Sequence, residues 1–283
     1  MAQIEKLYIY PVKSLQGISL QKAELTVRGF RYDRNWMITD QNGRFITQRK
    51  VPLFATIQVQ ITDAGLRLTS KSGDDLDIPF ESDKQEIRDT EIWGDHCKAF
   101  DEGDLASDWL TDTIGTVKGS RLRLVRIHDG YRRNVDPTHL RQGEDPHTAF
   151  ADGYPYLVTS ISSLNRLNEK LIETGAEAVP MDRFRPNIVI SGPEPFAENR
   201  IEELASVDGS WRLGFRKPCK RCKVTTVDQN AGTISNPAEP LRTLTEMQTV
   251  PELHGAYFGQ NAILLSQEGE MVRVGDRLKA EFG

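Results

Sequence analysis

Alternation of hydrophobic and polar residues dominates the first third of the chain and is typical of half-buried β-strands. Leu7 and Ile9, for example, each lie between polar or amphipathic neighbours. The turn at 41–43 contains Asn-Gly, which readily adopts positive φ and so favours a hairpin. We expect strands over residues 4–12, 36–39, 45–47, 56–62, 66–69, 78–80 and 86–93. Successive short strands separated by turns predict a barrel or a sandwich.

Helical periodicity interrupts the strands at three places. The clearest case follows Ser160, an expected N-cap, where one face of the helix carries Leu164, Leu167, Leu171 and Ile172 and Gly175 ends the helix. Shorter helices are expected over 102–113 and 240–247. Further strands are expected over 121–127, 187–191, 211–215, 223–227, 262–266 and 271–274, with a long polar loop over 128–147.

These elements predict a mostly β (α+β) fold with two packed domains and a few peripheral helices. A length of 283 residues suits two ordinary domains. The stretch Lys118-Gly119-Ser120 resembles a connection. We therefore expect an N-terminal β domain over residues 1–118 and a second domain over residues 119–283.

Composition narrows the possible classes of protein. With 38% hydrophobic and 27% charged residues the chain is typical of a globular protein, and it has no apolar run of the roughly 18 residues that a membrane span needs. The formal charge of -5 argues against a general nucleic-acid binder. No targeting segment is recognisable at the start, so a cytoplasmic protein that binds neither membrane nor nucleic-acid polymer is expected.

Cys219 and Cys222 lie in the segment 216–223, where five of eight residues are cationic. Neighbouring positive charges lower a thiol's pKa, which suits a nucleophile, a redox thiol or a soft metal ligand. A zinc site lacks support because the five histidines show no paired spacing. A dithiol of the thioredoxin type needs a helix after the first cysteine, whereas the β-branched run at 224–227 favours a strand. A buried structural cysteine beside a solvated charged edge is the remaining alternative.

Seven motifs in order along the chain carry a resemblance to a known family. They are IYPVKS (9–14), YDRNW (32–36), WGD (93–95), FRPNIVISG (184–192), CKRCKVTTVD (219–228), FGQN (258–261) and VGD (274–276). With them the sequence resembles the MOSC domain family of molybdenum-cofactor proteins, in the branch that contains bacterial YcbX and the mitochondrial amidoxime-reducing components. The resemblance implies an N-terminal MOSC_N-type β domain followed by a MOSC β-barrel.

The resemblance also implies a set of site residues. Cys222 would be the metal ligand, and a soft thiolate suits high-valent molybdenum. Asp152 would lie near the metal, where a carboxylate can relay a proton, although an Asp-Gly turn alone would also explain it. Lys220 stands where relatives often have Ser, and Asn261 where they often have an aromatic residue; Tyr154 is a further candidate. The implied cofactor contacts are Lys13, Ser14, Arg34, Arg185, Asn187, Lys220, Arg221 and Asn261.

By the same resemblance the protein is expected to be a molybdenum-cofactor (Mo-molybdopterin) oxidoreductase that reduces small N-hydroxylated compounds such as hydroxylamines, amidoximes and N-hydroxylated bases. No cysteine follows Cys222, so we expect no iron-sulfur cluster and no ferredoxin domain in this chain. A separate flavoprotein reductase or ferredoxin would supply electrons. The alternatives are a module that binds, carries or sulfurates the cofactor without reductase activity, and a structural domain without metal.

Overall fold

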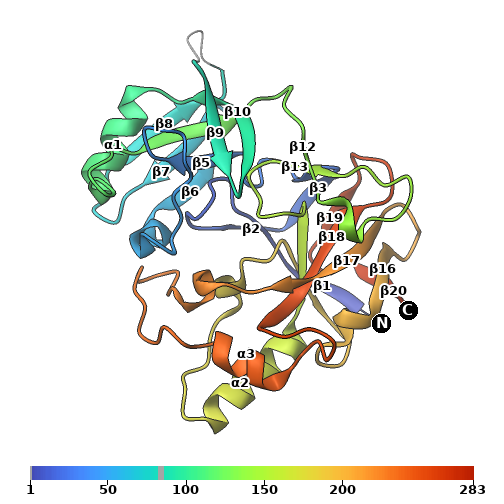
Figure 1. The fold of residues 1–283 in the computed structure, drawn as a ribbon. Helices are drawn as coiled ribbons and strands as arrows, with labels where there is room; N and C mark the ends of the chain where they lie inside the picture. The colour runs from blue at the N-terminus through green and yellow to red at the C-terminus, as the bar shows by residue number, and fades with distance from the viewer. Residues whose placement is uncertain (1, 82–85) are drawn as a thin grey trace.

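The structure is a computed structural model that describes residues 2–81 and 86–283. The mostly β fold expected from the sequence is confirmed in these residues, where strands far outnumber helices. The α-helices in this part of the chain are α1 (Asp104–Ile114), α2 (Ile161–Glu173) and α3 (Leu241–Met247). Figure 1 shows α2 and α3 side by side at one end of the molecule, with α1 at the opposite end.

A closed barrel forms the larger part of the molecule. Its strands, in spatial order, are β15 (Ile188–Ser191), β14 (Tyr156–Ser160), β18 (Tyr257–Leu264), β17 (Arg212–Lys220), β16 (Ile201–Ser206), β20 (Arg277–Phe282) and β1 (Ala2–Ile9). β1 closes the barrel because it also pairs with β15, with Leu7 opposite Ile188. A short strand, β2 (Ile18–Leu20), pairs antiparallel with the last residues of β1, with Leu7 opposite Leu20.

The barrel interior is filled by the inward-facing residues of the strands. Leu7 of β1, Val158 of β14 and Leu213 of β17 are fully buried in one hydrophobic cluster. Burial along β1 alternates with one break, where Glu5 and Lys6 are both exposed at a shift in register against β15. At roughly 25 cal/mol per Å² of apolar surface, burial of such side chains is the main stabilising contribution to this domain.

The N-terminal domain consists of two small antiparallel sheets and α1. One sheet contains β5 (Trp36–Thr39), β11 (Arg123–Ile127), β10 (Asp95–Asp101) and β9 (Ile87–Ile92), and the other contains β6 (Gln58–Ile61), β7 (Gly65–Thr69) and β8 (Asp75–Pro79). Trp36, Phe54 and Leu110 are buried between the sheets and the helix. The Trp36 indole also donates a hydrogen bond to Glu102 Oε1 at 2.7 Å.

The chain passes between the two parts more than once. β1 belongs to the barrel although it starts the chain, and β11 pairs with β5 and β10 although it follows residue 118. The short strands β3 (Lys22–Thr26) and β4 (Gly29–Phe30) pair with each other, and β3 also pairs with β19 (Met271–Arg273). β12 (Arg133–Asn134) pairs with β13 (His147–Thr148) inside the long polar loop. The division at residue 118 stays a prediction, and the elements on either side of it interlock.

Several expected elements differ from those observed. The expected strand at 45–47 is reduced to an isolated bridge between Thr39 and Phe45. β16 and β20 were not predicted, because their sequences are interrupted by charged residues that face solvent. The expected face of α2 is buried at Leu164, Leu167 and Leu171, which pack in one hydrophobic cluster with barrel residues, but Ile172 is 63% exposed. Among the described helices, none has the length and apolar character of a membrane span.

Candidate functional site

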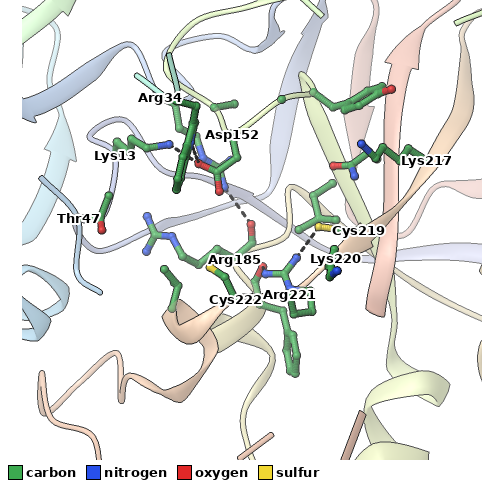
Figure 2. Close-up of a pocket in the computed structure, with 18 of the residues that line it drawn as sticks. Lys13, Arg34, Thr47, Asp152, Arg185, Lys217, Cys219, Lys220, Arg221 and Cys222 are labelled. Atoms are coloured by element: carbon green, nitrogen blue, oxygen red, sulfur yellow. Dashed lines mark hydrogen bonds and ion pairs between the residues drawn. The ribbon is translucent and has the colours of Figure 1, made fainter. Parts of the chain in front are cut away.

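A cavity of about 380 Å³ is lined by residues from both parts of the molecule. From the N-terminal segment come Lys13, Ser14 and Arg34, and from the barrel come Arg185 and the end of β17. Figure 2 shows Lys13, Arg34 and Asp152 on one side of this cavity and Cys219, Arg221 and Cys222 on another. Every site residue predicted from the sequence lines it: Lys13, Ser14, Arg34, Asp152, Tyr154, Arg185, Asn187, Lys220, Arg221, Cys222 and Asn261.

The cysteines reach the cavity through an irregular end of β17. The register of β17 against β18 shifts between Phe215 and Lys217 and again between Pro218 and Lys220. Bulges of this kind bend a strand and redirect its side chains. Cys219 lies within β17, which ends at Lys220, and Cys222 lies beyond that end. Both cysteines are partly buried and free of disulfide.

The predicted strand at 223–227 is wrong, because Lys223–Thr226 forms a 3₁₀ helix that begins directly after Cys222. The hydroxyl of Thr225 donates to the Cys222 carbonyl at 3.0 Å, and the hydroxyl of Thr226 donates to the Lys223 carbonyl at 2.9 Å. These bonds satisfy carbonyls near the turn, so the β-branched residues fit a helical conformation here. The predicted strand therefore no longer argues against a dithiol of the thioredoxin type. The choice between a dithiol and a metal ligand depends instead on the groups around the two cysteines.

Arg221 contacts one of the two thiols. Its Nη1 donates to Cys219 Sγ at 2.8 Å and its Nη2 donates to the Phe184 carbonyl at 2.7 Å. The Nε of Arg221 is buried and finds no acceptor among the described residues. Cys219 is thus engaged by a guanidinium. Cys222 also lines the cavity, and no hydrogen bond engages its sulfur among the described residues.

Arg185 is, like Lys13, a deeply buried cation of the site. Its backbone is left-handed, with φ of 53°, and its Nη1 donates to Gln229 Oε1 at 3.2 Å. Within the described residues, Nη2 of Arg185 has no hydrogen-bond partner although it is buried. Burial lowers the pKa of Arg185 to about 10, so the group is still cationic at neutral pH. Unsatisfied buried donors are costly, and an anionic ligand would satisfy this one.

Tyr10 supports two of the arginines. The guanidinium carbons of Arg34 and Arg185 lie 4.3 and 4.2 Å from the centre of its ring. Arg34 is also fixed by an ion pair with Asp33 at 2.6 Å and by a bond from Nη2 to the Arg185 carbonyl at 3.0 Å. Burial raises the pKa of Tyr10, so the phenol stays neutral beneath the cations. Both arginines are therefore held rigidly at the cavity wall.

Lys13 and Asp152 form an ion pair at the cavity. Lys13 Nζ lies 2.5 Å from Asp152 Oδ1 and 2.8 Å from the Phe150 carbonyl. Burial lowers the pKa of Lys13, and Asp152 partly offsets the effect. Partial loss of water at the cavity wall would raise the pKa of Asp152, whose side chain is 69% exposed, but the charge and hydrogen bond of Lys13 and a hydrogen bond from Trp93 hold it well below its usual range. Asp152 is therefore ionised at neutral pH.

The other predicted residues that line the cavity differ in whether their polar groups already have hydrogen-bond partners. The Asn187 amide is already engaged, since it accepts from the Leu157 N–H at 3.1 Å and donates to the Tyr8 carbonyl at 3.3 Å. The Tyr154 hydroxyl is buried with no acceptor or donor among the residues described, and burial raises the pKa of Tyr154 to about 12. Lys220 is exposed, with its ammonium 6.0 Å from the centre of the Tyr257 ring. The proposed roles of all these residues stay predictions.

The sequence interpretation assigned no role to several polar or aromatic residues that border the same cavity: Thr47, Arg49, Trp93, Asp136 and Lys217. Trp93 lies in one of the seven motifs, and Lys217 lies in the cationic segment, so both had a sequence signal. Thr47 and Arg49 had none. Their position depends on how the N-terminal domain packs against the barrel, which no local pattern encodes.

Fold and site together define a class: a β-barrel joined to an N-terminal β domain, with a cysteine among cations in the cavity between them. The MOSC N-terminal beta barrel domain model matches residues 1–117, and the MOSC domain model matches residues 145–279. The chain belongs to the MOSC domain family, in the branch of the amidoxime-reducing components.

Two curated relatives illustrate the range of the family. The chain is 32% identical to mitochondrial amidoxime-reducing component 1 of Homo sapiens over 291 residues, which cover 96% of this chain and 81% of that protein. It is 27% identical to molybdenum cofactor sulfurase of Homo sapiens over 244 residues, which cover 81% of this chain and 27% of that protein. The first similarity extends over most of both proteins, whereas the second covers only part of a longer one.

Proposed function

We propose that this protein is a molybdenum-cofactor-dependent oxidoreductase that reduces small N-hydroxylated compounds. The observation that carries the proposal is that Cys222 lines the same cavity as the incompletely paired Arg185 and Arg221 and the ionised Asp152. The similarity to an amidoxime-reducing component over 96% of the chain supports the same activity.

The donor set of the cavity fits the proposed cofactor. A dithiolene-bound molybdenum prefers a soft protein ligand, and Cys222 offers one. The cofactor phosphate needs charge-assisted donors, which the buried Nη2 of Arg185 and Nε of Arg221 can supply. A cavity of about 380 Å³ is within the range of roughly 300–1,000 Å³ found for small-molecule sites. Lys13, Ser14, Arg34 and Asn261 would complete the contacts.

When bound, the cofactor supplies two-electron redox chemistry. The overall reaction converts R–NHOH, two electrons and two protons into R–NH2 and water. In this proposal Cys222 binds the metal, and the arginines orient the pterin. Asp152 stays ionised beside Lys13, so it can accept a hydrogen bond from the substrate N–OH group and orient the reacting oxygen.

The electrons would come from another protein, a flavoprotein reductase or a ferredoxin, in a cytoplasmic setting. A chemical reductant can replace this donor in a test. Molybdenum-loaded protein with reduced methyl viologen should convert benzamidoxime into benzamidine and reoxidise the dye, and Cys222→Ala should abolish both effects. Loaded protein that does not consume benzamidoxime would contradict the proposed activity. Turnover with NADPH and this protein alone would contradict the need for a separate donor.

A second candidate function is a module that binds, carries or sulfurates the cofactor without reducing a substrate. The similarity to part of a molybdenum cofactor sulfurase favours it. The two candidates make opposite predictions for loaded protein mixed with an apo-molybdoenzyme. A reductase should retain its cofactor and be reoxidised by substrate, whereas a carrier should activate the apo-enzyme.

A further inference from the structure

Trp93 occupies an unusual position for a large aromatic residue. It lies in the turn between β9 and β10 with φ of 55°, and Gly94 follows with φ of 91°. The left-handed region is disfavoured for bulky side chains, and residues held there are concentrated at functional sites. The side chain is 46% exposed, so hydrophobic burial alone does not explain this conformation.

The indole of Trp93 is nevertheless held in place by specific contacts. The Phe45 ring lies 4.7 Å away between ring centres, and the guanidinium carbon of Arg49 lies 4.4 Å from the centre of the Trp93 ring. The indole Nε1 donates to Asp152 Oδ1 at 3.0 Å. Phe45 and Arg49 belong to the N-terminal domain, and Asp152 precedes the barrel strand β14. Trp93 therefore connects the N-terminal domain to the carboxylate of the site.

The two donors to Asp152 both use the same oxygen. Oδ1 accepts from Lys13 Nζ at 2.5 Å and from Trp93 Nε1 at 3.0 Å. In the described part of the chain no hydrogen bond engages Oδ2, and 69% of the Asp152 side chain is exposed. This pairing fixes the carboxylate through one oxygen and leaves the other open to a ligand in the cavity.

From this geometry we propose that Trp93 is a positioning residue for Asp152. It holds Oδ1 so that Oδ2 can accept a hydrogen bond from the N–OH group of the substrate. This role rests on the proposed reductase function. Through Trp93, the N-terminal domain would orient the Asp152 carboxylate toward substrate as well as help to bind the cofactor.

The charged groups around Asp152 determine how the loss of its hydrogen bond from Trp93 would appear in the kinetics. Lys13 and Arg34 act on the carboxylate, and Arg133 donates to the Asp152 carbonyl at 3.4 Å. These cations remain in Trp93→Phe, but one hydrogen bond to the ionised form is lost. The pKa of Asp152 should rise, so the acid limb of kcat/KM should move to higher pH. The loss of a hydrogen bond to a charged group should lower kcat/KM by about tenfold or more at neutral pH.

Indole NMR tests the contact without any need for activity. In 1H–15N spectra of the full chain, the resonance that disappears in Trp93→Phe should shift in Asp152→Asn. Trp109→Phe is a matched control, because the Trp109 indole on α1 has no hydrogen-bond partner in the described chain. Its resonance should not respond to Asp152→Asn. A Trp93 resonance that also fails to respond would overturn the proposal.

Kinetics test the consequence. With loaded protein, Trp93→Phe should shift the acid limb of kcat/KM upward, while Trp109→Phe should leave it unchanged. An acid limb identical to that of the wild type in Trp93→Phe would also overturn the proposal. If the loaded wild type reduces no N-hydroxylated compound, the proposed function fails, whereas the indole spectra still report on the Trp93 contact. The two failures are therefore distinguishable.

Discussion

Gln229 Nε2 donates a hydrogen bond to Gln48 Oε1 at 2.7 Å, so a buried amide pair joins the barrel to the N-terminal domain. The pair continues in both directions. Gln48 Nε2 donates to the Ser14 carbonyl at 3.0 Å, and Arg185 Nη1 donates to Gln229 Oε1 at 3.2 Å. A network of hydrogen bonds thus runs from the Arg185 guanidinium to the Ser14 carbonyl. Because it crosses from the barrel to the N-terminal domain, it couples the packing of the two domains to the shape of the cavity.

Truncation of this amide pair should destabilise the protein. Gln229→Ala leaves Gln48 Oε1 buried without its donor, a defect that costs about 1–3 kcal/mol. Urea unfolding should show this loss, and the double variant with Gln48→Ala should cost less than the sum of the single changes. Gln58→Ala, at an exposed position of β6, is the control and should change stability little. Equal effects of Gln229→Ala and Gln58→Ala would show that the network contributes nothing to stability.

Arg216 and Glu144 form a buried ion pair that fixes the polar loop to β17. Arg216 Nε donates to Glu144 Oε2 at 2.9 Å, and Nη2 of Arg216 bonds the other carboxylate oxygen. Glu144→Ala should destabilise the protein by about 3–5 kcal/mol, because it leaves a buried guanidinium without its partner. The midpoint of urea unfolding measures this loss. A loss below about 1 kcal/mol, the value of an exposed ion pair, would contradict the prediction.

The same pair predicts a pH dependence of stability. Burial would raise the pKa of Glu144, but the hydrogen bonds and charge of Arg216 outweigh it, and the pKa is lowered. A carboxyl whose pKa is lowered in the folded state stabilises the fold above its unfolded pKa of about 4.3. That contribution should be lost as pH falls below this value. Unfolding free energies of Glu144→Gln should therefore fall less steeply with acid than those of the wild type; parallel curves would contradict the account.

Asp152→Asn should separate chemistry from cofactor binding. The amide keeps the size of the side chain but removes the charge that accepts a hydrogen bond from substrate, so kcat should fall by about tenfold or more. Molybdenum content should change little. Asp145→Asn serves as the control, because Asp145 is an exposed partner of Arg132. Activity in Asp152→Asn close to that of the Asp145 variant would remove Asp152 from the mechanism.

Motifs in the sequence located the candidate site more completely than local patterns located the strands. Lys13, Asp152 and Cys222 are far apart in sequence and border one cavity, as the resemblance implied. Periodicity could not predict that β1 closes the barrel against β15, because that pairing joins residues more than 180 positions apart. It also assigned a strand at 223–227, where hydroxyl bonds from Thr225 and Thr226 stabilise a 3₁₀ helix instead.

Cys222 is the residue on which the proposed function depends most directly. Molybdenum should be measured by elemental mass spectrometry, together with pterin fluorescence, in protein purified from a host that makes the cofactor. Wild type and Cys219→Ala should hold close to one molybdenum per chain, whereas Cys222→Ala should lose it or hold it loosely. Zinc in place of molybdenum, or neither metal nor pterin in the wild type, would contradict the proposal that this cavity binds the molybdenum cofactor.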